Sequence, residues 1–319
     1  MSRPATHAGS WYSDDPRSLK SQLLGYLQAT GLTGQRGASV IVSPHAGYRY
    51  CGETMAHAYA SLDLTDVSRI FIMGPSHHVY FKNKVLVSGF GSLETPLGSL
   101  EVDQELADEL LSSRHFAEMD PGVDMEEHSI EMQFPMLAQT LQWRNVPLDS
   151  VKVVPLMVSH NSKEVDWKIG GVLGKFMKPG TVFIISSDFC HWGRRFGYTG
   201  YVGSQDELDD AMSQETEIEL LTSRSKLSHH QLDIWESIAL LDRAAMNVLQ
   251  LPGNKYDHWK KYLEVTGNTI CGARPIALVL AILAQTRDAT FQFPAYSQSS
   301  HVCDLHDSSV SYGSGFATM

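Results

Sequence analysis

The sequence is poor in cysteine and in basic residues, and it lacks a long hydrophobic run. Four cysteines occur among 319 residues and none form a Cys-x-x-Cys pair, which argues against a disulfide scaffold, a zinc knuckle or a thioredoxin-type motif. Acidic residues outnumber basic ones by 36 to 25, a balance that argues against a dedicated nucleic-acid-binding protein. The longest apolar run, residues 276–283, is far shorter than the ~20 residues of a membrane helix. We therefore expect no nucleic-acid partner and no membrane insertion.

The composition is that of a folded protein in a reducing compartment. With 43% hydrophobic and 19% charged residues, the chain has enough apolar surface to bury a core. Residues 1–12 have no apolar segment of the kind found in a signal peptide. These features predict a cytoplasmic protein, with the nucleus as a second possible location.

Strand-like and helix-like segments alternate along the chain, and no linker or repeat interrupts them. This alternation predicts an α/β fold, with residues 1–319 as one domain. Strands are predicted at residues 38–42, 69–73, 151–158, 181–186, 291–296 and 308–312. Helices are predicted at residues 14–27, 52–62, 102–111, 126–141, 164–176 and 275–283, and over most of 204–251. Pro135 is expected to kink or break the helix that contains it.

Three of the predicted strands run directly into polar loops that carry histidine or aspartate. His45, His77 and the pair Asp188 and His191 each follow such a strand. Because ligands of α/β sheets bind at the carboxyl ends of the strands, these side chains are expected to meet at one edge. The alternative for each histidine is a simple hydrogen bond to a loop backbone. Asp188 could bind a metal or orient an imidazole, and His191 could transfer protons.

Two further positions suggest chemistry. Cys271 precedes a strongly apolar helix, and the positive end of a helix dipole favours a thiolate that could bind metal or act as a nucleophile. Its alternative role is a small buried apolar side chain. His128 lies between Glu127 and Glu131 at a predicted helix start, where it could serve as an acid or base. The alternative is that acidic residues merely favour the first turn of a helix.

Together these segments resemble the Memo family. The matching pieces are HAGSWY at 7–12, PHAGY at 44–48 with YCG at 50–52, GPSHH at 74–78, EHSIE at 127–131, SSDFCHWG at 186–193, NTICG at 268–272 and the region 296–312. They occur in order over nearly the whole chain. The forms of the 186–193 segment and of Cys271 are those of the eukaryotic branch.

This resemblance carries specific expectations. The family is similar in fold to class III extradiol dioxygenases, which implies a central mixed sheet flanked by helices. It implies that His45, His77 and Cys271 take the metal-ligand positions, with Asp188 beside them. From their positions alone, His128, Asp188 and His191 are the catalytic candidates, and Asp188 is also a candidate metal ligand. Cysteine stands where the dioxygenases have glutamate, and a soft thiolate shifts the preference toward copper and away from the iron triad. Copper or iron is thus the expected cofactor.

Three functions follow as hypotheses. The first is a metal-dependent redox protein linked, by the family resemblance, to cell motility and cytoskeletal signalling. The second is a non-catalytic adaptor that binds a phosphorylated receptor peptide or a cytoskeletal signalling protein in the old cleft, with Arg194, Arg195 and Arg274 as the phosphate-binding candidates. The third is a hydrolase with Cys271 as its nucleophile.

Overall fold

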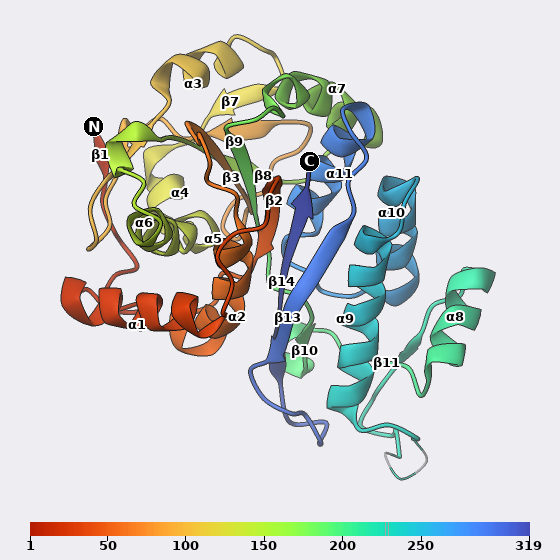
Figure 1. The fold of residues 1–319 in the computed structure, drawn as a ribbon. Helices are drawn as coiled ribbons and strands as arrows, with labels where there is room; N and C mark the ends of the chain where they lie inside the picture. The colour runs from red at the N-terminus through yellow and green to blue at the C-terminus, as the bar shows by residue number, and fades with distance from the viewer. Residues whose placement is uncertain (227, 229) are drawn as a thin grey trace.

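The computed structural model describes residues 1–319 except 227 and 229 and is built around one large mixed β-sheet (Figure 1). Neighbouring strands of this sheet follow the order β1-β5-β6-β8-β3-β9-β2-β14-β10, while β13 pairs with β14, and β4 pairs with β7 and β8. The main strands are β2 (Ala38–Ser43), β3 (Arg69–Pro75), β8 (Lys152–Val158), β9 (Thr181–Ser186), β13 (Phe291–Gln298) and β14 (Ser309–Thr318). The shorter ones are β1 (Ser2–Arg3), β4 (Val85–Val87), β5 (Ser92–Leu93), β6 (Leu100–Val102), β7 (Phe116–Glu118) and β10 (His191–Trp192). A separate pair consists of β11 (Gly200–Tyr201) and β12 (Glu219–Leu220).

Helices cover both faces of the sheet. On one side lie α1 (Pro16–Ala29), α2 (Tyr48–Ser61), α5 (His128–Glu131) and α6 (Gln133–Trp143). On the other lie α3 (Gln104–Leu111), α7 (Lys163–Leu173), α9 (Ile234–Gln250), α10 (Lys255–Thr266) and α11 (Ala273–Gln285). Figure 1 shows α2 and α11 on opposite sides of β14. Two further helices, α4 (Pro121–Glu126) and α8 (Gln205–Gln214), lie nearer the periphery.

Alternation along the central strands divides the core into two layers. Val40 and Val42 of β2 join the cluster beneath α11, whereas Ile41 between them joins the cluster beneath α2. The same alternation occurs in β3 and β9, because successive side chains of a strand point to opposite faces. Both faces are apolar, which explains why these strands appear in the sequence as continuous hydrophobic runs.

The predicted fold class is confirmed: the chain is α/β, with a central mixed sheet flanked by helices. The strands predicted at 38–42, 69–73, 151–158 and 181–186 agree with β2, β3, β8 and β9 to within two residues at either end. That residues 1–319 act as one domain stays a prediction.

Some predicted elements differ from those observed. The helix expected at 126–141 is divided at Glu127 and Met132, and Pro135 lies in the first turn of α6, where no intrahelical partner for its missing N–H is needed. The stretch 204–251 is less helical than predicted, since α8 and α9 are separated by a segment that contains β12. Residues 227 and 229 of that stretch lie outside the described residues. Val102, predicted as the first residue of a helix, is the last residue of β6.

Within the described residues, no helix has both the length and the apolar character required to cross a bilayer.

Candidate metal centre

The site lies at the carboxyl ends of three neighbouring parallel strands. In the sheet, β9 pairs with β3 on one side and with β2 on the other, both in parallel. His77, Asp188 and His45 each lie two residues beyond the end of β3, β9 and β2, respectively. The expected meeting of these side chains at one edge of the sheet therefore occurs.

His128 reaches the same place from the start of α5. Gly74 in β3 allows this approach, because a Cβ atom there would lie 2.7 Å from Cγ1 of Ile130 and 2.7 Å from Oγ of Ser129. The Ser129 hydroxyl also donates a hydrogen bond of 3.0 Å to the carbonyl oxygen of Pro75. Close packing of α5 on the end of β3 brings the ring of His128 to within 4.3 Å of the ring of His77, measured between centroids.

His45, His77 and His128 form a triad with metal-ligand spacing. One ligand atom from each lies within 4.8 Å of the others. Two nitrogens that bind one ion at about 2.1 Å each lie about 3.4 Å apart in a tetrahedral site, so the ligand atoms would have to close by up to about 1.4 Å. His45 is buried, with 1% of its surface exposed, whereas the His77 side chain is 29% exposed. The triad therefore opens to solvent on the His77 side.

Hydrogen bonds fix the tautomer of His45. The Ser186 hydroxyl donates its proton to the carbonyl oxygen of Ser129 at 2.6 Å and accepts from Nε2 of Gln133 at 2.8 Å. Nδ1 of His45, 2.8 Å from the same hydroxyl oxygen, must therefore be the donor. Burial lowers the pKa of His45 well below its usual value, and the nearby His77 lowers it further, so the ring is neutral. Its Nε2 then carries a lone pair that is available to a metal.

His77 is oriented by a buried carboxylate. Nδ1 of His77 donates to Oε1 of Glu127 at 2.7 Å, and the backbone N–H of His77 donates to Oε2 at 2.7 Å. Burial alone would raise the pKa of Glu127, but the hydrogen bonds and charge of His77 hold it well below the usual range. An ionised carboxylate behind a ligand imidazole fixes the ring and raises its basicity, as in many metal sites.

His128 lies between two aromatic rings. Its ring stacks on that of Trp11 at 4.4 Å and on that of His77 at 4.3 Å. Burial, together with the neighbouring rings of His45 and His77, lowers the pKa of His128 to about 3. The ring is therefore neutral at physiological pH and has a nitrogen lone pair, which suits a ligand better than a general acid.

Cys271 and Asp188 lie against the buried end of the triad. Sγ of Cys271 is 3.1 Å from Nε2 of His45 and accepts a hydrogen bond of 3.2 Å from the backbone N–H of Asp188. The Asp188 carboxylate accepts from the backbone N–H of His45 at 2.8 Å, and its Oδ2 is 4.0 Å from Nε2 of His45. The predicted residues His45, His77, Asp188 and Cys271 are thus brought together.

The thiolate predicted for Cys271 is not favoured by the protein groups around it. The dipole of α11 was expected to favour a thiolate. Burial instead raises the pKa of the thiol well above its usual value, and the negative charge of Asp188 raises it further. The thiol stays protonated at neutral pH unless a cation binds beside it, because a metal ion stabilises the thiolate.

His191 belongs to the surroundings of the site. It lies in β10, and its Nδ1 faces the carbonyl oxygens of Phe189 and Thr269 at 3.0 and 3.2 Å. Both are acceptors, so Nδ1 carries the proton. Burial raises the pKa of Asp188, and His191 is the strongest opposing influence. His191 therefore lowers the pKa of Asp188 and lies outside the three-histidine triad.

A family model for a Memo-like protein matches residues 3–316 of the 319-residue chain. The chain belongs to the Memo family. It is 58% identical to the MEMO1 family protein MHO1 of Saccharomyces cerevisiae, and the alignment covers 99% of each chain. It is 40% identical to a MEMO1 family protein of Schizosaccharomyces pombe, over 99% of this chain and 98% of that one. It is 36% identical to human Protein MEMO1, over 99% of this chain and 97% of the human one.

These relatives confirm the predicted Memo family and its eukaryotic branch. The similarity of the Memo fold to class III extradiol dioxygenases stays a prediction, as do the individual roles assigned to His45, His77, His128, Asp188, His191 and Cys271.

Sequence reasoning about this Memo protein missed the residues that orient the histidines. Ser186 and Gln133 were not singled out, although they fix the tautomer of His45. Glu127 was noted only for its helical spacing, yet it holds His77 in place. The one signal in the sequence for the position of His128 was Gly74. A glycine at a strand end often marks a close approach by another element.

Proposed function

We propose that this protein binds a redox-active transition metal, copper or iron, through His45, His77 and His128. The observation that carries the proposal is the spacing of the three histidines, with one ligand atom of each within 4.8 Å of the others. Cys271 adds a soft sulfur donor and Asp188 a hard oxygen donor at the buried end. A sulfur beside imidazoles favours copper, whereas imidazoles with a carboxylate suit iron.

The metal would supply one-electron transfer, and the chain would control its surroundings. Glu127 would hold the ring of His77, and Ser186 would hold that of His45 with Nδ1 protonated. Asp188 and His191 would take or release a proton at the buried side, where burial makes ionisation of the carboxyl sensitive to nearby charge. The proposed setting is the cytoplasm, with the nucleus as an alternative, and the proposed pathway is cell motility and cytoskeletal signalling.

An anaerobic titration with Cu(I) and with Fe(II) tests the metal proposal. The wild-type chain should bind one ion, and His77→Ala and His128→Ala should each lower the affinity at least tenfold by removing one ligand. Cys271→Ala should weaken Cu(I) binding more than Fe(II) binding, because thiolate is the softer ligand. The control is His306→Ala, since His306 is exposed in a distant part of the sequence. Equal stoichiometry and affinity in all the variants would refute the site.

Redox activity needs a separate measurement. Oxygen consumption by the copper-loaded protein with ascorbate as the electron donor should exceed that of the His77→Ala and His128→Ala variants at the same total copper. Metal binding without a protein-dependent change in oxygen uptake would limit the role to metal binding.

The adaptor role is the second candidate. Arg274 lines a cavity beside Cys271, whereas Arg194 and Arg195 are exposed in the short helix Arg194–Phe196. A phosphopeptide that binds equally well after chelation and loses affinity in Arg274→Gln would favour this role. The hydrolase is disfavoured, because a thiol with a raised pKa is a poor nucleophile.

A further inference from the structure

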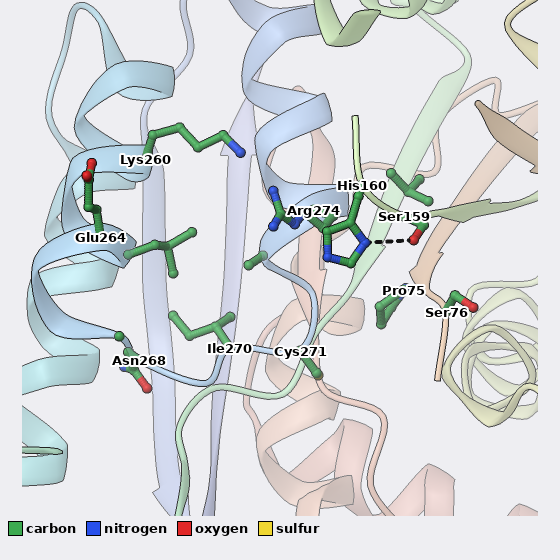
Figure 2. Close-up of a pocket in the computed structure, with 14 residues that line it drawn as sticks. Pro75, Ser76, Ser159, His160, Lys260, Glu264, Asn268, Ile270, Cys271 and Arg274 are labelled. Carbon is green, nitrogen blue, oxygen red and sulfur yellow. Dashed lines mark hydrogen bonds between the residues drawn. The ribbon is translucent and has the colours of Figure 1, made fainter. Parts of the chain in front are cut away.

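A cavity of about 560 Å³ adjoins the histidine triad (Figure 2). Pro75 and Ser76, which immediately precede His77, form one wall, and residues of α10 and the start of α11 form another. Cys271 lines the cavity as well, and its sulfur lies 3.1 Å from Nε2 of His45. The cavity and the triad therefore share a boundary at Cys271, and the volume is in the range of small-molecule sites.

Two side chains bring positive charge to this cavity. Figure 2 shows the Lys260 ammonium and the Arg274 guanidinium pointing toward the same space, with the ring of His160 beside the arginine. Among the described residues, neither Lys260 nor Arg274 has an ion-pair partner. Lys261, next along α10, is by contrast paired with Glu215 at 2.8 Å.

The pKa values of Lys260 and His160 are consistent with the closeness of Lys260, Arg274 and His160. Burial lowers the pKa of Lys260, and the positive charge of Arg274 lowers it further. Burial also lowers the pKa of His160, with added effects from Arg274 and Lys260. Glu264 is the acidic residue that lines the cavity, and in Figure 2 its carboxylate lies on the side away from Arg274. Asp166 offsets this positive charge in part, but among the described residues it forms no ion pair with Lys260 or Arg274. Like charges held together in this way favour binding of an anion.

We propose that this cavity binds a small-molecule oxyanion, a carboxylate or phosphate. The anionic group lies between Arg274 and Lys260, and the rest of the molecule extends toward Cys271 and the triad. Guanidinium matches the two oxygens of a carboxylate or phosphate. The cavity is then the substrate half of the metal site, and only this last assignment rests on the proposed metal function.

Calorimetric titration of the chelator-treated protein at constant ionic strength tests the anion site. The probes are malate, succinate, which lacks the hydroxyl of malate, and inorganic phosphate. Malate and succinate should bind with similar affinity, because each offers carboxylates to Arg274 and Lys260. Arg274→Gln and Lys260→Gln should each weaken malate binding at least tenfold. Lys261→Gln is the matched control and should leave it unchanged. Thermal melting of each variant shows that a loss of binding is not a loss of folding.

Three results would overturn the assignment. One is probe affinity that is equal in the wild type, Arg274→Gln and Lys260→Gln. Another is tight, Arg274-dependent binding of a phosphotyrosyl peptide with no binding of the small probes, which would make the cavity a peptide site. The third is a Cu(II) electron paramagnetic resonance spectrum that saturating malate leaves unchanged, which would separate the cavity from the metal.

A failure of the metal proposal can be distinguished from a failure of the anion site. Arg274→Gln should bind copper with wild-type stoichiometry, so a loss of anion binding alone counts against this inference only. Intact malate binding in a protein that binds no metal counts against the metal site only.

Discussion

At the scale of single residues, Glu127 links two of the histidines in the site. Its carboxylate accepts hydrogen bonds from the ring and backbone of His77 and from the backbone N–H of Ser129, in the first turn of α5. One side chain therefore orients a histidine at the end of β3 and caps the helix that carries His128. Two ligands of the proposed metal depend on the same carboxylate.

Replacing Glu127 by glutamine should weaken the metal site without unfolding the chain. The amide keeps an oxygen for the helix cap but loses the charge behind His77, and such partners typically contribute 10–100-fold to metal affinity. Titration with Cu(I) should therefore give an affinity lower by about that factor. Glu126→Gln is the control, because Glu126 is exposed at the end of α4. Equal losses in the two variants would mean that the charge of Glu127 has no specific role.

Residue types at strand ends predicted much of the site. His45, His77 and Asp188 could be found because each follows a buried strand by two residues, and parallel strands end at one edge. The place of His128 could not be found in this way, since it depends on how closely α5 packs against Gly74. The protonation of Cys271 could not be predicted either. Local sequence indicates the helix dipole, which favours a thiolate, but not the burial and the Asp188 carboxylate that raise the pKa of the thiol by more.

At the scale of elements, the junction between β9 and α11 sets the position of Cys271. A Cβ atom at Gly272 would lie 2.2 Å from Cβ of Ser187 and 2.7 Å from the carbonyl oxygen of Ser186. The backbone N–H of Gly272 also donates to the Ser187 hydroxyl at 3.1 Å. The start of α11 can therefore lie against the end of β9 only because residue 272 has no side chain.

Gly272→Ala should displace this junction. The clash involves backbone and a short side chain that cannot turn away, so we expect a loss of about 1–3 kcal/mol in the free energy of unfolding. Cu(I) affinity should fall as well, because the neighbouring Cys271 moves with the helix start. Gly25→Ala in α1 is the control: no atom lies within 4 Å of its added Cβ, and alanine favours a helix by about 0.5–1 kcal/mol. Urea unfolding measures both, and equal stability of Gly272→Ala and wild type would contradict the packing argument.

The boundaries of elements were harder to predict than their existence. Pro135 was expected to interrupt a helix, but the interruptions come at Glu127 and Met132, and the proline fits the first turn of α6. Gly313 and Gly315 lie inside β14, where added Cβ atoms would come within 2.7 Å of Phe189 and 2.6 Å of Phe293. Such glycines provide space for aromatic rings, which a single sequence cannot distinguish from a flexible turn.

At the scale of the whole molecule, Asp242 joins several distant segments. Its carboxylate accepts from the backbone N–H of Cys190, from Asn268 and from the hydroxyls of Tyr296 and Ser311. Burial nevertheless raises the pKa of Asp242 to about 6, because the hydrogen bonds offset only part of the desolvation.

The stability of the fold should therefore depend on pH through Asp242. Between about pH 4 and 6 the native state binds a proton that the unfolded state has released, so the free energy of unfolding falls as pH rises and levels off above about pH 6. The difference between 3.8 and about 6 corresponds to roughly 3 kcal/mol. Urea unfolding of the wild type minus that of Asp242→Asn should show this slope. In this variant the asparagine oxygen can still accept from Cys190 and Asn268. Its amide nitrogen can donate to the hydroxyl oxygens of Tyr296 and Ser311, because a hydroxyl can rotate to accept. Parallel pH profiles would exclude Asp242 as the cause.

The position of β14 in the sheet has a consequence for biosynthesis. This strand pairs with β2, the strand that precedes His45, yet it is made after every other strand of the sheet. While the chain is being translated, one edge of β2 has no neighbour and its backbone groups are open to other chains. Cys271 and α11 also emerge late. A nascent chain that captures metal through its histidines would therefore do so before its sulfur and its final strand are in place.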